Sequence, residues 1–132
     1  MTGDAERQLI LVVDDNYEIR RYAKAFLENA GYAVVTAADG EEGLRCYEAH
    51  QSSILLLLTD VMMPNMNGLE LADRVLGIDS RLPVLFMSGD AGETYSGTRY
   101  LSKPFRSAEL VERVRRMVNA QTLGTNRSRG LA

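Results

Sequence analysis

Five consecutive apolar residues, Ile54 to Leu58, constrain the fold of this chain more than any other feature. A strand with one face in water alternates apolar and polar side chains, whereas this run presents apolar side chains to both faces. The run is also far too short for a membrane helix, which needs roughly 18 apolar residues. It therefore predicts a central parallel strand that is covered on both sides.

Strand and helix patterns alternate along the rest of the chain. Such alternation is typical of an α/β fold in which helices cover both faces of a parallel sheet. Gly31 suits a left-handed helix end, Asp39 and Glu42 form a capping-box pattern, and Ser107 is the expected cap of the last helix. The five expected strands are residues 9–13, 32–36, 54–58, 83–87 and 98–101.

Length and charge limit the kinds of protein this chain can be. Its 132 residues suit one domain, which we place at residues 9–121, between a flexible N-terminus (1–8) and a flexible polar tail (122–132). The net charge of −3 gives no general attraction to nucleic acid or to anionic membranes. With a single cysteine, Cys46, no internal disulfide can form. We therefore expect a cytoplasmic protein without direct nucleic-acid binding or membrane insertion.

Polar residues follow four of the expected strands. In open parallel sheets ligands bind beyond the carboxyl ends of the strands, so these side chains should converge at one edge. They are Asp14 and Asp15 after the first strand, Asp60 after the third, Ser88 after the fourth and Lys103 after the fifth.

These residue types suit phosphoryl transfer. Carboxylates ~4 Å apart repel each other by about 1 to 4 kcal/mol per pair, depending on the dielectric, and a hard cation such as Mg²⁺ offsets that repulsion. Lys103 and Ser88 can hold phosphoryl oxygens, and Asp60 can act as the nucleophile. Each residue alone is weak support, because an aspartate at a strand end is usually a loop or cap residue. The conjunction is what favours this chemistry.

The motifs around these residues resemble those of response-regulator receiver domains, from about Leu9 to Asn119. Residues 60–68 resemble the family's acceptor-site loop and residues 12–16 its acidic metal corner. Residues 87–89 resemble the switch hydroxyl, residues 103–105 the lysine-proline element, and Tyr100 the switch aromatic. The resemblance implies a flavodoxin-like, doubly wound sheet of five parallel strands in the order 2-1-3-4-5.

The resemblance also implies roles for single residues. Asp60 would be phosphorylated by a sensor histidine kinase or a histidine phosphotransfer protein, and the domain would catalyse only its own phosphorylation and dephosphorylation. Ser88 and Tyr100 would form the conformational switch, and the Lys103–Pro104 peptide would be cis. Mg²⁺ would be bound by Asp14 (mostly through water), Asp15, Asp60 and the backbone carbonyl of Met62, and the phosphoryl oxygens by Lys103, Ser88 and the Gly89 backbone.

The segment after Ser88 departs from the family pattern. Only residues 89–97 separate Ser88 from the fifth strand, too few for a helix of roughly 11 residues with loops of about 2 to 6 residues on each side. We therefore expect the fourth helix to be shortened or absent, which leaves the downstream partner unknown. The segment carries three glycines, which favours a mobile switch, and Asp90 within it could orient the hydrolytic water.

Three other functions fit the sequence less well than this one. A degenerate receiver that acts as a protein-interaction module without phosphorylation is the strongest rival, because the shortened segment could have lost its signalling role. An aspartyl-phosphate phosphatase needs Asp-x-Asp on its first strand, whereas Asp14 and Asp15 are adjacent. A flavin-binding protein needs a loop rich in hydroxyls and glycine, where this chain is acidic.

Overall fold

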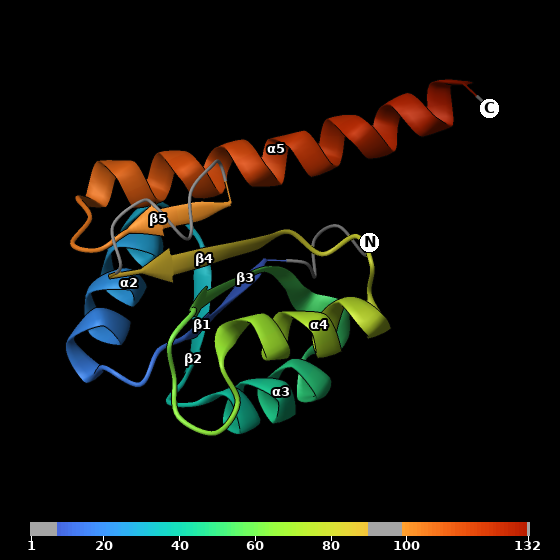
Figure 1. Ribbon diagram of the computed structural model, residues 1–132. Coiled ribbons are helices and arrows are strands. Elements are labelled where there is room, and N and C mark those ends of the chain that lie inside the picture. Colours follow the sequence, from blue (N-terminus) through green and yellow to red (C-terminus); the bar gives the residue numbers. More distant parts are fainter. Residues whose placement is uncertain (1–7, 90–98, 132) are drawn as a thin grey trace.

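The computed structural model describes residues 8–89 and 99–131. A single sheet of five parallel strands runs through the domain in the order β2-β1-β3-β4-β5 (Figure 1). This is the flavodoxin-like order expected from the sequence, with β3 at the centre. The strands are β1 (Leu9–Val13), β2 (Ala33–Ala37), β3 (Ile54–Asp60), β4 (Val84–Ser88) and β5 (Tyr100–Ser102).

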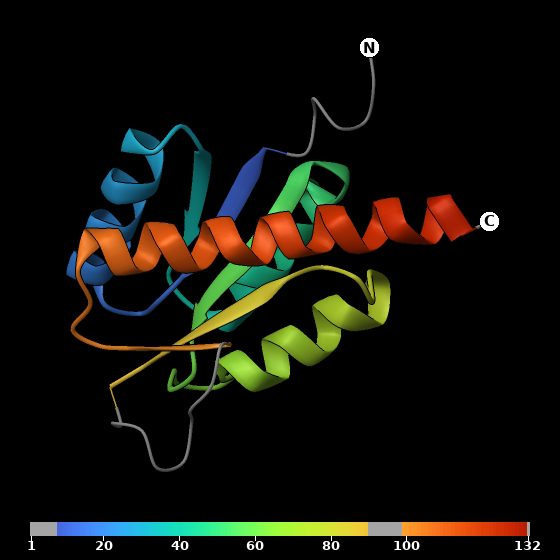
Figure 2. The same ribbon diagram turned by 90° about the horizontal axis from the view of Figure 1, so that it is seen from above.

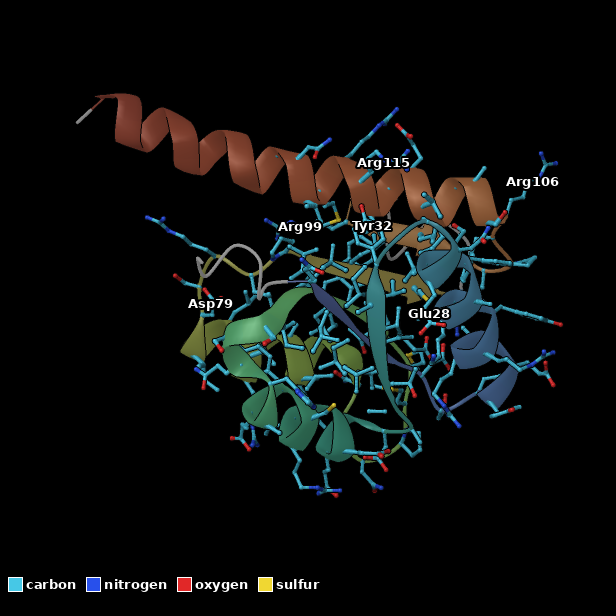
Figure 3. The ribbon with its side chains drawn as sticks, turned by 180° about the vertical axis from the view of Figure 1, so that it is seen from behind. Glu28, Tyr32, Asp79, Arg99, Arg106 and Arg115 are labelled. Atoms are coloured by element: carbon cyan, nitrogen blue, oxygen red, sulfur yellow. The ribbon has the colours of Figure 1, made fainter. Side chains whose placement is uncertain are left out.

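Two pairs of helices cover the two faces of this sheet. Helices α2 and α5 lie on one face, and α3 and α4 lie on the other (Figures 1 and 2). Charged side chains such as Arg106 and Arg115 lie at the outer surface (Figure 3). The helices are α2 (Tyr17–Asn29), α3 (Gly40–Ala49), α4 (Gly68–Ile78) and α5 (Ser107–Leu131), with a short 3₁₀ turn, η1 (Gln51–Ser53), before β3.

The central strand β3 is buried on both faces, as its apolar run predicts. Leu56 and Leu58 pack in the core with α2 and α5, while Leu57 packs with α3 and α4. All three side chains are fully buried, and truncating such a leucine to alanine typically costs about 2 to 5 kcal/mol. The two cores therefore fix the position of Asp60 at the end of this strand.

Two expectations about helix caps needed correction. Ser107 is the first residue of α5, and the preceding Arg106 N–H bonds to Glu109 Oε1 (2.9 Å). Glu42 completes the cap of α3 through the N–H of Ala38 (2.7 Å), because its carboxylate reaches one residue beyond the Asp39 N–H that a capping box uses. Asp39 does accept from the Glu42 N–H (2.8 Å), as expected.

Helix α5 also runs longer than the sequence indicated. It continues to Leu131, past Gln121, where a polar tail was expected, and it extends beyond the edge of the sheet (Figure 2). Residues 107–131 contain no proline, so no residue there interrupts the backbone hydrogen bonds of a helix. The flexibility of both chain ends stays a prediction.

The connection from β4 to β5 consists of residues 89–99. Of these, residues 90–98 lie outside the described residues, so the expected loss of the fourth helix and the role of Asp90 fall on a part of the chain that is not described. The described part places helices only before β4 and after β5. None of these helices is both long and apolar enough to span a membrane.

Candidate functional site

The strand ends bring the expected acidic residues together. Asp14 directly follows β1 and Asp60 is the last residue of β3; both are buried, while the neighbouring Asp15 is exposed. One carboxylate oxygen from each of the three residues lies within 4.8 Å of the others. The structure therefore places the three carboxylates close enough to bind one cation together.

Lys103 lies among these carboxylates. Its Nζ is 2.8 Å from Asp14 Oδ2 and 3.2 Å from Asp60 Oδ1, and its side chain is 18% exposed. Its backbone N–H donates to the carbonyl of Ser88 (2.8 Å), which holds the end of β5 beside the end of β4. The following Lys103–Pro104 peptide is cis, as the resemblance implied.

Burial and charge shift the protonation of this site. Burial raises the pKa of Asp60, the nearby Asp14 raises it further, and Lys103 and the Met62 N–H offset only part of that rise. Burial lowers the pKa of Lys103, but the Asp14 and Asp60 carboxylates together outweigh it, so this pKa is raised. The lysine thus stays charged, while Asp60 holds a proton more readily than an ordinary aspartate.

Three contacts hold Asp14 in place besides Lys103. Its N–H donates to the carbonyl of Ala37 on β2 (3.2 Å). Its Oδ1 accepts from the Asn16 N–H (2.8 Å), and its carbonyl accepts from Arg20 Nη1 (2.7 Å). Asn16 is also the N-cap of α2, where its side chain accepts from the N–H groups of Glu18 and Ile19. The acidic corner is therefore built on the first turns of α2.

Sequence reasoning missed the parts played by Asn16 and Arg20. Asn16 carried a usable signal, because asparagine directly before a helical pattern is a preferred N-cap. Arg20 carried none, because its reach to the Asp14 carbonyl depends on how α2 sits against β1.

The loop after Asp60 folds back against it. The Val61 N–H donates to the carbonyl of Met87 (3.0 Å), and the Gly68 N–H donates to the carbonyl of Val61 (2.9 Å). A Cβ on Gly68 would lie 2.0 Å from the backbone oxygen of Asp60, so this position admits only glycine without a local shift. Met62, two residues after Asp60, is 66% exposed.

The three remaining expected residues lie along β4 and β5. Ser88 is buried at the end of β4, and a Cβ added to the following Gly89 would meet nothing within 4 Å among the described residues. Tyr100, at the start of β5, stacks on Phe86 with ring centroids 5.2 Å apart. Ser88 itself pairs with Ser102, two positions after Tyr100, across the two strands.

The donor set fits a hard divalent cation. Carboxylate oxygens are the ligands that Mg²⁺ prefers, and three such groups lie together here. Asp14 Oδ2 is wholly buried, and within the described residues its polar neighbour is the Lys103 ammonium. Three carboxylates beside one ammonium leave an excess of negative charge when all are ionised, which a cation would neutralise.

Comparison with known proteins gives a consistent result. The family model described as the response regulator receiver domain matches residues 10–115. The receiver protein CpdR of Brucella abortus is 36% identical over 119 residues, covering 84% of this chain and 97% of CpdR. The receiver domain of the hybrid histidine kinase CckA superposes with a TM-score of 0.72 at 38% identity, covering 83% of this chain and 98% of that domain.

Several similar proteins are considerably longer than this chain. The probable transcriptional regulator ycf27 of Cyanophora paradoxa is 35% identical over 137 residues, which cover 96% of this chain but 56% of the regulator. The chain spans about half the length of other transcriptional regulators that it matches. The expectation that this protein does not contact nucleic acid therefore stays a prediction.

Proposed function

The chain belongs to the family of response regulator receiver domains, and on that premise we propose that it accepts a phosphoryl group on Asp60 in two-component signalling. One observation carries the proposal: the Lys103 ammonium lies between the Asp14 and Asp60 carboxylates at the carboxyl edge of the sheet. That arrangement combines a nucleophile, a fixed positive charge and an acidic cluster that fits a cation. These are the parts phosphoryl transfer uses.

The proposed step is a displacement at phosphorus. A carboxylate oxygen of Asp60 forms the new P–O bond, the P–N bond to a donor phosphohistidine breaks, and the released imidazole nitrogen takes up a proton. The donor is a sensor histidine kinase or a histidine phosphotransfer protein. Because the acceptor is the domain's own side chain, the protein catalyses only its own phosphorylation and dephosphorylation.

The other site residues act on charge and position. Asp14 (mostly through water), Asp15, Asp60 and the Met62 carbonyl would hold Mg²⁺, which would neutralise charge on the carboxylates and on the phosphoryl oxygens. Lys103 exchanges part of its contact with the carboxylates for a phosphoryl oxygen. Ser88 and the Gly89 N–H bind the remaining oxygens, and Ser88 moves toward Asp60 together with Tyr100.

Beryllofluoride, which imitates an aspartyl phosphoryl group, tests this proposal without any kinase. Wild-type protein with Mg²⁺ and beryllofluoride should show amide chemical-shift changes at Asp60, Ser88 and Lys103. The changes should vanish in excess chelator and in Asp60→Asn. Equal changes in Asp60→Asn would show that the proposed acceptor is wrong.

A further inference from the structure

Arg20, on α2, contacts the backbone of the acidic cluster without belonging to it. Arg20 lies in the first half of α2 and its Nη1 donates to the backbone carbonyl of Asp14 at 2.7 Å, across six residues. The guanidinium also lies over the Tyr17 ring, 5.6 Å from its centroid. Arg20 is half-buried, so both contacts restrict a side chain that is otherwise long and flexible.

The Asp14 carbonyl belongs to the peptide group that joins Asp14 to Asp15. A peptide group is planar, so fixing its carbonyl oxygen also fixes the direction of the Asp15 N–H and the position of the Asp15 Cα. The Asp14 N–H is already held by Ala37, and its carboxylate by Asn16. Arg20 therefore restrains the Asp14 carbonyl, the remaining polar group of this residue, and with it the peptide that leads to Asp15.

Of the three carboxylates, that of Asp15 depends most on its backbone for its direction. Asp14 and Asp60 are buried and both contact Lys103, whereas the Asp15 side chain is exposed. Because that side chain is exposed, packing restrains it little, and the direction of its carboxylate depends mainly on its backbone. A shift of the Asp14–Asp15 peptide would turn that carboxylate away from the other two.

We propose that Arg20 is a positioning residue of the cation site, which holds the Asp14–Asp15 peptide so that Asp15 faces Asp14 and Asp60. The inference rests on the proposed function, because it assumes that the cluster binds a divalent cation. Arg20 touches neither the cation nor the phosphoryl group. Its role resembles that of the outer partners that orient metal ligands in other proteins, whose loss lowers metal affinity by about 10- to 100-fold.

The direction in which cation affinity changes when Arg20 is replaced distinguishes a positioning role from a purely electrostatic one. Arg20 is a positive charge near a cation site, so deleting only its charge should strengthen cation binding. Loss of positioning should weaken binding instead. Arg20→Met, which keeps the length of the side chain but removes its charge and its donors, therefore gives opposite results under the two accounts.

The experiment measures Mn²⁺ binding to the unphosphorylated protein from the electron paramagnetic resonance signal of the free ion. We expect Arg20→Met to weaken binding by about tenfold and Arg20→Lys, which retains a donor and the charge, to restore part of the loss. The matched control is Arg21→Met, because Arg21 is the next residue of α2 and binds exposed Glu18. Arg21→Met should leave Mn²⁺ affinity unchanged.

A second measurement needs no metal. The amide ¹H–¹⁵N resonance of Asp15 should move in metal-free Arg20→Met and stay in place in Arg21→Met, while resonances of the β1 core report an intact fold. Unchanged or tighter Mn²⁺ binding by a folded Arg20→Met would overturn the positioning role and leave the proposed function standing. A wild type that binds no divalent cation would overturn both.

Discussion

The Lys103 ammonium lies 2.8 Å from Asp14 Oδ2, closer than it lies to the proposed phosphoacceptor. In the cation-free protein Lys103 thus does what a divalent cation would do: it offsets the repulsion between buried carboxylates. Under the proposed function, it must give up part of this contact when a cation and a phosphoryl group bind.

Lys103→Met should destabilise the cation-free protein and strengthen its binding of Mg²⁺. Removing one partner of a buried ion pair typically costs about 3 to 5 kcal/mol, and the 18% exposure of Lys103 places this case at the lower end. Urea unfolding with chelator and calorimetric titration with Mg²⁺ measure the two effects. Lys24→Met is the control, because Lys24 pairs with Glu28 at the surface and exposed pairs contribute at most about 1 kcal/mol. Weaker Mg²⁺ binding by Lys103→Met would contradict this competition between lysine and cation.

Asp60→Asn should stabilise the cation-free protein at neutral pH. Burial and Asp14 raise the pKa of Asp60 in the folded state. A carboxyl with a raised folded pKa favours the fold below its unfolded pKa of about 3.9, and that contribution is lost as pH rises through the folded pKa. The advantage of Asp60→Asn should therefore be largest near neutral pH and shrink as the pH falls toward the unfolded pKa.

Thermal unfolding in chelator across this pH range measures the effect. Asp73→Asn, which removes an exposed carboxylate from α4, controls for the change in net charge. An Asp60→Asn variant that is less stable than wild type at neutral pH, without metal, would mean that burial of the ionised Asp60 is not costly.

Two glycines of α4 should respond oppositely to alanine. Gly68→Ala places a Cβ 2.0 Å from the backbone oxygen of Asp60, and such overpacking typically costs about 1 to 3 kcal/mol. The same clash should displace Asp60 and slow its labelling by a small phosphodonor. Gly77→Ala meets nothing within 4 Å, so it should stabilise the helix by up to about 1 kcal/mol. Urea unfolding compares them, and equal stability of Gly68→Ala and wild type would refute the close approach.

Phosphorylation should tighten the ends of β4 and β5. If Ser88 binds a phosphoryl oxygen and moves with Tyr100, amide exchange at both residues should slow when Mg²⁺ and beryllofluoride are added. The stack of Tyr100 on Phe86 provides two packed surfaces that can shift together. Slower exchange confined to Asp60 and Lys103 would instead favour a receiver that binds partners without this switch.

The sequence predicted that the three aspartates and Lys103 converge, because the fold class determines where strand ends meet. Apolar runs that stop at Asp14, Asp60 and Ser88 were visible without a structure. The end of β3 was not predictable in this way: the strand extends past the expected end at Leu58 to Asp60, because Asp60 pairs with Met87 on the neighbouring strand. The close approach of Gly68 to Asp60 and the reach of Arg20 to Asp14 depend on how α2 and α4 sit against the sheet, so they appear only in three dimensions.

The intact mass of the protein after incubation with Mg²⁺ and acetyl phosphate tests the central claim most directly. Wild type should gain one phosphoryl group, Asp60→Asn should gain none, and excess chelator should abolish the gain in wild type. An equal gain of mass in wild type and Asp60→Asn, or no gain in wild type with Mg²⁺ present, would contradict the assignment of Asp60 as the phosphoacceptor.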